Sequence, residues 1–584
     1  MKWTEARIIV RIWSFTWAVH NRYQPPLNET LVVHIFFDNH LVRTNYPVFL
    51  IVLTTPEMKL PTILTKKGVQ EARSRLDGLL RFHQTAIINL KIEENSLTPI
   101  CSLPPEILSY IFILAQRQFD PYKGRDVTQV CHYWREVGIG CPALWADLAL
   151  VDYRWTELML KRSTQVPLTI RVHTTRRNWL GVIKIVRSMS TETSRFKDVE
   201  IDAEAHDLAK ITQRWTSAAP QLESLDLSAG LVGRSADKPF HLSDEIFGGE
   251  APCLAYLKLD GCSIGWRSGL LQALTHLELH NIPFQPTFSE FLAVLERASS
   301  LETLHCDDSI SNVRDEEEIG SAVVVRLPSL RKLILSEHIL VVDRLLRYLL
   351  IPASAARIIS CSDAWVVPEM VSAFSRVVGS NCVGDRKVIT HAHISVEDYS
   401  FKLEGHEMKS DRAAFSFAQR CSRPILKIEA LRAMCNNPAL SSIELVSIDD
   451  QGGRRMNNWV EALGVLHDIK TVMVSINWTG VVSCLGATAA GVGSSGSVFF
   501  PNLRVLMFSH IRCPAVCRED RFCDQLFDGL TARTKNGGRR LENLFVNNSS
   551  CYGLHDQDIH PLVDRFVWFG QDEDGYVTDD SDGL

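Results

Sequence analysis

The sequence predicts an α/β fold in which parallel strands alternate with helices in a repeated array, preceded by a small all-helical unit. Two observations predict it. A leucine pattern recurs from residue 222 onward, and a proline-opened set of helical segments lies between residues 99 and 150. We expect the parallel strands on the concave face of the array and the helices on its outer face.

The leucine pattern L-x-x-L-x-L marks the expected strands. Full copies are Leu222-x-x-Leu225-x-Leu227, Leu254-x-x-Leu257-x-Leu259, Leu274-x-x-Leu277-x-Leu279 and Leu330-x-x-Leu333-x-Leu335, and partial copies begin at Leu301, Leu440, Leu503 and Leu541. The starts at 222, 254, 274, 301 and 330 are 32, 20, 27 and 29 residues apart. These steps are centred near the leucine-rich repeat period of about 20–29 residues, so we predict an irregular leucine-rich-repeat solenoid.

Alternation along each strand separates a buried set of residues from an outward set. The last two leucines of each copy point inward, and the residues between them point outward. The outward residues are candidates for a recognition surface: Glu223, Ser224, Asp226, Ala255, Tyr256, Lys258, Thr275, His276 and Glu278. The alternative for each is a solvated strand residue without a partner.

The repeat region is expected to cover residues 151–570. A helix at 155–164 and a strand at 167–172 open it. The leucine signal fades between Ile351 and Asn436, but three segments still resemble strands: Ile358–Cys361, Val388–Ile394 and Ile425–Ile428. We therefore expect irregular repeats there rather than a break.

Residues 99–150 predict a compact helical unit. Pro104 and Pro105 suit the opening of a helix, and Glu106 suits its first turn. One apolar face, which we expect to be buried, follows at helical spacing: Ile107, Leu108, Ile111, Phe112 and Ala115. A second helix is expected through Val127, Val130, Cys131, Trp134 and Val137, and Pro142, Leu144 and Trp145 close the unit. So few residues bury a small core, which implies a partner.

These residues resemble a known family. Leu103-Pro104-Pro105-Glu106-Ile107-Leu108, then Val130-Cys131-x-x-Trp134-Arg135, then Pro142-x-Leu144-Trp145, resemble the F-box of the large fungal (basidiomycete-type) F-box families. The resemblance implies docking on a Skp-type adaptor, and through it on a cullin–RING ubiquitin ligase. It implies adaptor contacts at Leu103, Pro104, Pro105, Ile107, Leu108, Ile111, Phe112, Val130, Cys131 and Trp134. Trp134 and Trp145 are also expected to hold the unit together.

Two functions are compatible with this organisation. The first is a substrate-receptor subunit, in which the repeat region binds a protein target whose identity the sequence does not encode. The alternative is a ligase-independent scaffold that uses the F-box only for binding. We predict no catalysis by the chain itself, because it contains no GxSxG elbow, P-loop, HExxH or cysteine-protease signature.

Composition argues against several other classes of protein. Sixty-two basic and sixty-eight acidic residues give a net charge of −6, too weak to indicate nucleic-acid binding. The fifteen cysteines lack a CxxC spacing, which favours a reducing compartment, cytoplasmic or nuclear. No apolar run approaches the ~20 residues needed to cross a bilayer, so we expect no membrane partner.

Three motifs contain residue types that bind cofactors or metals, but their spacing or context does not favour binding. Gly491-Val-Gly493-Ser-Ser-Gly496 matches GxGxxG, but no helix is expected to follow it, so we predict no cofactor. The spacing of His510, Cys513, Cys517 and Cys523 matches no usual zinc pattern. His391 and His393 share a strand face without an apparent third ligand. We predict no metal site.

The two ends of the chain are less informative. Residues 1–62 stay unassigned, because a disordered lead, an isolated strand or a misplaced start codon would each explain them. Residues 63–98 predict an amphipathic helix with a stripe through Val69, Ala72, Leu76, Leu79, His83, Ile87 and Leu90. It could form a dimeric coiled coil or fold back on the rest of the chain, and we favour folding back. Residues 571–584 predict an acidic disordered tail.

Overall fold

The computed structural model contains two compact units, residues 1–85 and 86–584. The described residues are 66–118, 124–149, 153–173, 179–230, 240–311, 324–362, 367–380, 382–383, 388–407, 413–420, 424–451, 459–489, 497–510, 521–547 and 559–569. The first 62 residues, the acidic tail and the GxGxxG motif therefore lie outside them. Among these ranges, no helix combines the length and apolar character that a membrane span needs.

The predicted amphipathic helix is α2 (Lys66–Ser96), which crosses the division between the units. None of its residues is buried in the described structure. Apolar side chains such as Leu79, Phe82 and Leu90 stay at least half exposed. The choice between a dimeric coiled coil and a folded-back helix stays open.

The second unit opens with short helical segments. They are η1 (Pro99–Ser102), α3 (Pro105–Gln118), η2 (Gly124–Gln129), α4 (His132–Ile139) and η3 (Pro142–Trp145). The predicted single helix through residues 127–137 is wrong, because the chain is extended at Cys131 (φ −152°, ψ 175°). Cys131 is the N-cap of α4 and its Sγ accepts a hydrogen bond from the backbone N–H of Trp134. A cap of this kind begins a new helix rather than continuing the old one.

Within the described residues, a large, mostly parallel sheet of 17 strands follows the helical segments. In order of hydrogen-bonded neighbours, its strands are β1 (Asp147–Ala149), β2 (Leu168–His173), β3 (Phe196–Ala203), β4 (Ser224–Ala229), β6 (Tyr256–Asp260), β8 (His276–His280), β9 (Thr303–Asp307), β11 (Lys332–His338), β13 (Ala356–Ser362), β17 (Ala413–Arg420), β16 (Ser400–Glu407), β15 (Ile389–Val396), β18 (Leu445–Asp450), β19 (Thr471–Ser475), β22 (Val505–Ser509), β23 (Leu541–Asn547) and β24 (Val563–Phe569). The fold class is thus mixed α/β, as predicted.

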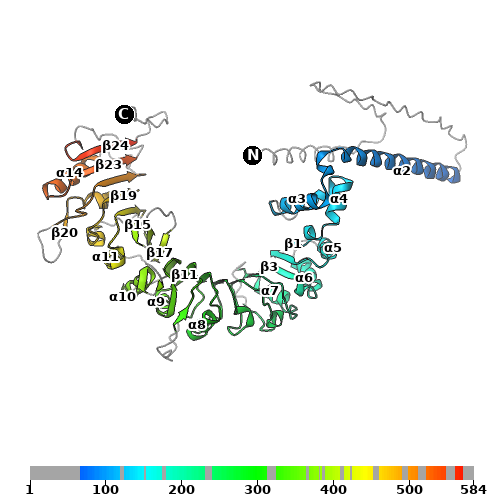
Figure 1. The fold of residues 1–584 in the computed structure, drawn as a ribbon, viewed down its shortest axis with the longest axis horizontal. Coiled ribbons are helices and arrows are strands. Elements are labelled where there is room, and N and C mark those ends of the chain that lie inside the picture. Colours follow the sequence, from blue (N-terminus) through cyan, green and yellow to red (C-terminus); the bar gives the residue numbers. More distant parts are fainter. Residues whose placement is uncertain are drawn as a thin grey trace, which may run out of the picture. The chain divides into compact units, whose positions relative to one another are not determined.

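Helices connect many of the strands and lie along one face of the sheet, leaving the other face of the strands open (Figure 1). They are α5 (Tyr153–Ser163), α6 (Trp179–Ser188), α7 (Ala205–Thr212), α8 (Phe288–Arg297), α9 (Ile339–Tyr348), α10 (Val367–Ser375), α11 (Pro424–Cys435), α12 (Trp459–Leu463), α13 (Thr479–Val482) and α14 (Arg521–Lys535). Short helical turns are η4 (Thr193–Arg195), η5 (Ile246–Gly249), η6 (Gly269–Leu271), η7 (Arg376–Ser380) and η8 (Pro438–Leu440). Smaller sheets contain β5 (Phe240–His241), β7 (Cys262–Ser263), β10 (Val325–Arg326), β12 (Leu349–Pro352), β14 (Cys382–Val383), β20 (Thr488–Ala489) and β21 (Ser497–Val498).

The leucine pattern sets the register of the sheet. The two strand leucines of each full copy are fully buried, from Leu225 and Leu227 in β4 to Leu333 and Leu335 in β11. Aligned neighbours such as Leu227, Leu259 and Leu279 form rows on the helix side. The partial copy at Leu440 is displaced, because Val446 and Ile448 point inward in β18 while Leu445 does not.

The fading region departs from the expected all-parallel array. After β13 the chain adds β15, β16 and β17 as an antiparallel meander, in which β17 pairs with β13 and β15 pairs with β18. The segment Ile358–Cys361 lies in β13, and the predicted strand Val388–Ile394 lies in β15 from Ile389 onward. The predicted strand Ile425–Ile428 is wrong, because it lies in α11, where Pro424 opens the helix and Leu431 and Met434 are buried one turn apart.

A carboxyl group is buried where β11 ends. Glu337 is only 4% exposed and accepts hydrogen bonds from the backbone N–H and the hydroxyl of Ser309, both at 2.8 Å. Burial raises the pKa of Glu337 to about 7, although the Ser309 donors act in the opposite direction. The folded chain therefore holds this proton more tightly than the unfolded chain, in which the pKa of glutamate is ordinary.

We predict that Glu337 makes the stability of the fold depend on pH. The contribution of its raised pKa to the free energy of unfolding is fully present below about pH 4.5 and is lost as the pH rises through about 7. The difference in unfolding free energy between the wild type and Glu337→Gln should change by roughly 3 kcal/mol over that range. Denaturant unfolding of both proteins at pH 5 and pH 8 measures it. An equal pH dependence in the two proteins would contradict the prediction.

Candidate functional site

Helix α3 carries apolar side chains on two different faces. The predicted buried face, which grouped Ile107 with Leu108, divides in the structure. Leu108 and Phe112 are buried at 0% and 1% exposure, while Ile107 is 50% exposed. Gln116, a polar residue on the same helix, is also buried. An apolar helix surface this wide can pack on its own core and still leave a second face open.

The inward face of α3 packs against α4 and η3. The ring of Phe112 lies 5.0 Å from that of Trp134, measured between centroids. Trp145 is fully buried, and its indole N–H donates a 2.8 Å hydrogen bond to the carbonyl of Gly138. A Cβ at Gly138 would lie 2.9 Å from a methyl group of Thr128, so this close approach requires glycine. Trp134 and Trp145 thus hold together the helical unit (residues 99–118 and 124–146).

The helical unit is joined firmly to the sheet. Directly after η3, strand β1 pairs in parallel with β2, and the N–H of Thr169 donates to the carbonyl of Ala146 at 3.0 Å. The Trp145 ring meets Trp155 of α5 edge-on, with centroids 5.8 Å apart. The guanidinium of Arg162 stacks 4.4 Å from the Trp145 centroid. The two parts share one hydrophobic core, so the sheet fixes the orientation of α3.

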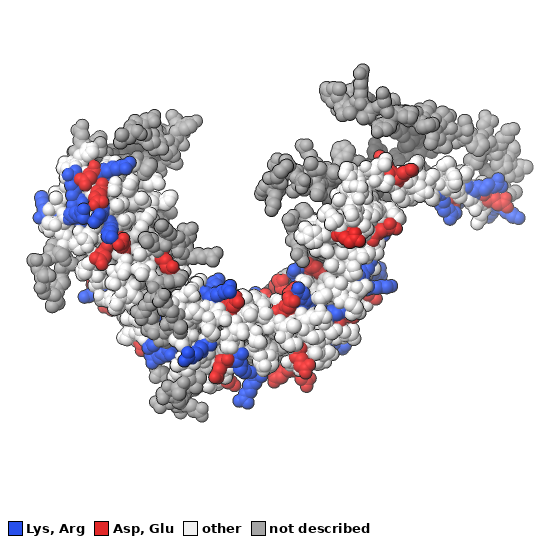
Figure 2. Space-filling view, in the orientation of Figure 1, with Lys and Arg blue, Asp and Glu red and all other residues white. Residues whose placement is uncertain are grey.

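The outward face of α3 is apolar and has no described partner within the chain. Ile107, Tyr110 and Leu114 follow at positions i, i+3 and i+7 and are 50%, 61% and 41% exposed. We call these three residues the α3 stripe. Val130, just before α4, is 49% exposed. Figure 2 shows few charged side chains on the visible face around α3 and α4. An exposed apolar patch of this kind marks an interaction surface.

The structure separates the predicted adaptor contacts into two groups. The exposed ones are Pro104, Pro105, Ile107 and Val130, and those with partial exposure are Leu103, Ile111, Cys131 and Trp134. Leu108 and Phe112 are buried in the core of the free chain, and their role as contacts stays a prediction. Tyr110 and Leu114 were missed in the sequence, although their spacing from Ile107 is helical. The sequence feature that could have identified them is a helix with apolar residues on nearly every side.

The open face of the sheet carries the predicted outward residues. Asp226, Lys258, Glu278 and His305 are register partners on four adjacent strands, from β4 to β9. The ammonium of Lys258 donates to a carboxylate oxygen of Asp226 at 3.0 Å. The unburied residues of β3, β4, β6, β8 and β9 include more acids than lysines: Asp198, Glu200, Asp202, Asp226, Asp260, Glu278 and Asp307 against Lys197 and Lys258.

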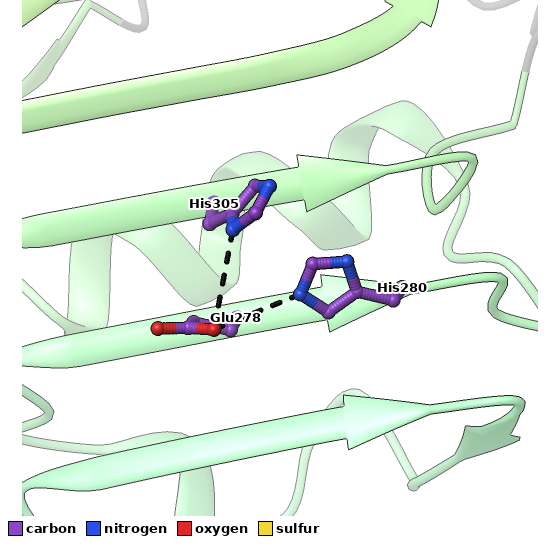
Figure 3. Close-up of side chains that lie close together, drawn as sticks. All are labelled: Glu278, His280 and His305. Atoms are coloured by element: carbon purple, nitrogen blue, oxygen red, sulfur yellow. Dashed lines mark ion pairs between the residues drawn. The ribbon is translucent and has the colours of Figure 1, made fainter. Parts of the chain in front are cut away.

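Two histidines and a carboxylate meet on this face (Figure 3). Glu278 and His280 lie two residues apart on β8, and His305 pairs with Glu278 from β9. One oxygen of Glu278, Oε2, lies 3.7 Å from Nε2 of His280 and 3.9 Å from Nδ1 of His305. Burial, followed by the neighbouring His280, lowers the pKa of His305. Its imidazole is therefore neutral near pH 7, with a lone pair available.

The other histidine and cysteine motifs do not form such a group in the described residues. His391 stacks on His406, with centroids 5.1 Å apart, and bonds to the hydroxyl of Ser447. Burial lowers the pKa of His391. Of the cysteine-rich motif, Cys523 is buried in α14, while Cys513 and Cys517 lie outside the described residues. That neither motif binds a metal therefore stays a prediction.

Comparisons with known proteins add no family to these observations. No protein-family model matches the chain, and no curated protein matches it.

We predict that truncating the two faces of α3 has unequal effects on stability. Leu108→Ala leaves a cavity in the core and should lower the opening free energy of the helical unit by about 2–5 kcal/mol. Ile107→Ala removes an exposed side chain and should change it by less than about 0.5 kcal/mol. Native-state hydrogen exchange of the α3 amides measures both. Similar losses in the two variants would mean that Ile107 is buried in solution.

Proposed function

We propose that the chain is an F-box substrate receptor of a Skp–cullin–RING ubiquitin ligase. In this proposal the helical unit docks on a Skp-type adaptor, and the open face of the sheet binds a protein target. The observation that carries the proposal is the α3 stripe, an exposed apolar helix face within the segment that resembles the F-box.

The geometry of the helical unit supports docking through α3. Ile107, Tyr110 and Leu114 cover about two turns of one helix face, and Pro104, Pro105 and Val130 flank it with further exposed apolar surface. A groove on a partner can receive such a face through anchors at i, i+3 and i+7. The core beneath the stripe, including Leu108 and Phe112, keeps the helix rigid, which reduces the entropy lost on binding.

The sheet supports the second half of the proposal. We infer that its strand and helix units form an irregular leucine-rich-repeat solenoid, because successive strands pair in parallel and bury the same leucine positions. The outward face combines an acidic excess with Tyr256, an aromatic side chain suited to protein contacts. A target with a basic surface segment would complement this face.

The function would require no chemistry by this chain. A receptor that holds a target beside a ubiquitin-charged enzyme raises the local concentration of the target's lysines. The rigid junction of the helical unit with β1 and β2 suits this role, because it fixes the direction in which the sheet presents a target relative to the adaptor.

We predict that a charge in the α3 stripe abolishes adaptor binding without unfolding the chain. Ile107→Asp places a carboxylate where the adaptor would cover it, and should weaken association with a purified Skp-type adaptor at least about tenfold. Biolayer interferometry with the full chain measures the affinity.

Phe527→Asp is the matched control, since Phe527 is a similarly exposed apolar residue on α14, at 39%. Its affinity for the adaptor should equal that of the wild type. The proposal fails if the wild type does not bind the adaptor, or if Ile107→Asp binds as well as Phe527→Asp.

We predict that true targets accumulate when the adaptor contact is lost. Proximity labelling in cells should recover the same neighbours from the wild type and from Ile107→Asp, because the sheet is intact in both. The abundance of some of these neighbours should rise only with Ile107→Asp. If cullin is absent from the wild-type sample and no neighbour changes in abundance, the chain is a ligase-independent scaffold.

A further inference from the structure

We propose that Glu278, His280 and His305 form a three-ligand site for a divalent transition-metal ion, for which Zn²⁺ is the representative ion. This proposal departs from our prediction from the sequence that the chain has no metal site. The ligands come from two neighbouring strands, so their spacing along the chain resembles no zinc motif.

The donor set suits this class of ion. Two imidazole nitrogens and a carboxylate oxygen bind Zn²⁺ and its neighbours in the first transition row, whereas Mg²⁺ and Ca²⁺ prefer oxygen ligands alone. The ligand atoms of all three residues lie within 4.8 Å of one another. Three protein ligands leave a fourth position for water or for a group on a bound partner.

The distances need only small adjustments. Ligand atoms in a tetrahedral zinc site lie about 3.4 Å apart, given zinc–ligand bonds of about 2.0–2.1 Å. Glu278 Oε2 is 3.7 Å from Nε2 of His280 and 3.9 Å from Nδ1 of His305. The two imidazole rings are nearly perpendicular, at 85°, with centroids 4.4 Å apart. Figure 3 shows both rings directed toward the same carboxylate.

A neighbouring carboxylate orients one of the ligands, and two further side chains lie near Glu278. Oδ2 of Asp307 lies 3.8 Å from Nδ1 of His280, on the side of the ring away from Glu278. A carboxylate in that position favours a proton on Nδ1 and leaves the lone pair on Nε2. Burial, followed by the nearby carboxylate of Glu278, raises the pKa of the Tyr256 hydroxyl on β6. Lys258, the register partner of Glu278, is engaged with Asp226.

The site rests on rigid backbone. Its strands β8 and β9 lie inside the sheet, with β6 and β11 as their outer neighbours. The residues next to the ligands along each strand point the opposite way and are fully buried: Leu279 in β8, and Leu304 and Cys306 in β9. Ligands held on packed strands keep their geometry better than ligands on loops.

Zinc titration of the metal-stripped full chain tests the proposal. Isothermal calorimetry should detect binding of one Zn²⁺ ion by the wild type. In His280→Gln, His305→Gln and Glu278→Gln this binding should be lost, or its affinity should be at least about tenfold lower. Asp307→Asn should weaken it about 10-fold to 100-fold by releasing His280. His391→Gln is the matched control, because His391 is also half-buried on an outward strand face and stacks on another histidine, and it should bind as the wild type does.

Cobalt spectra distinguish this site from adventitious binding by cysteines. Co²⁺ bound to the wild type should show ligand-field bands without thiolate charge-transfer absorption, and the bands should disappear in His305→Gln. Circular dichroism in the absence of metal should show all variants folded, and any one ligand variant that folds suffices for the comparison. Absence of zinc binding, binding unchanged in the folded ligand variants, or a thiolate band that persists in them would overturn the proposal.

Discussion

The fold depends on a single constraint: every strand of the large sheet must point its alternating apolar residues toward the helices. A slip of one residue between neighbours would expose one row of leucines and bury a row of charges. The buried rows through Leu227, Leu259 and Leu279 prevent that slip, because each exposed leucine would cost about 2 kcal/mol of burial free energy. This register then decides which polar side chains meet on the open face.

The geometry of both candidate surfaces depends on this buried core. On the sheet, it aligns Glu278 with His305 across two strands and leaves His280 beside them. At the start of the unit, it extends through Trp145 and Trp155 into the helical segments, so that α3 packs through Leu108 and Phe112 and leaves Ile107 exposed. The adaptor-binding and metal-binding proposals therefore concern different surfaces of one body, and each can fail without the other.

Much of the fold could be predicted because its strongest signals are periodic. The leucines of β4, β6, β8 and β11 repeat a spacing that leaves little choice of inward side, and prolines mark the beginning of α3. Strands β3 and β19 were missed because their inward positions hold other residues than leucine: Phe196, Val199 and Ile201 in β3, and Val472 and Val474 in β19. A window of four residues, Ile425–Ile428, is too short to separate a strand from a turn of α11.

The candidate sites were less accessible to sequence reasoning. The split of α3 into two apolar faces depends on how α4 and η3 pack, which no local pattern contains. The Glu278, His280 and His305 group needs the pairing of β8 with β9 before its members become neighbours. The resemblance to the F-box identifies the segment that forms the helical unit. Only the packing of its helices shows which residues are buried, such as Phe112, and which ones a partner could contact.

The proposed docking requires the α3 stripe to be open in the free chain and covered by a Skp-type adaptor in the complex. Hydroxyl-radical footprinting of the full chain, with and without the purified adaptor, tests this requirement at the level of side chains. We expect Tyr110 and Leu114 to be oxidised in the free chain and protected in the complex, while Phe527 reacts equally in both. Protection of Tyr110 already in the free chain, or equal oxidation of the stripe with and without bound adaptor, would contradict it.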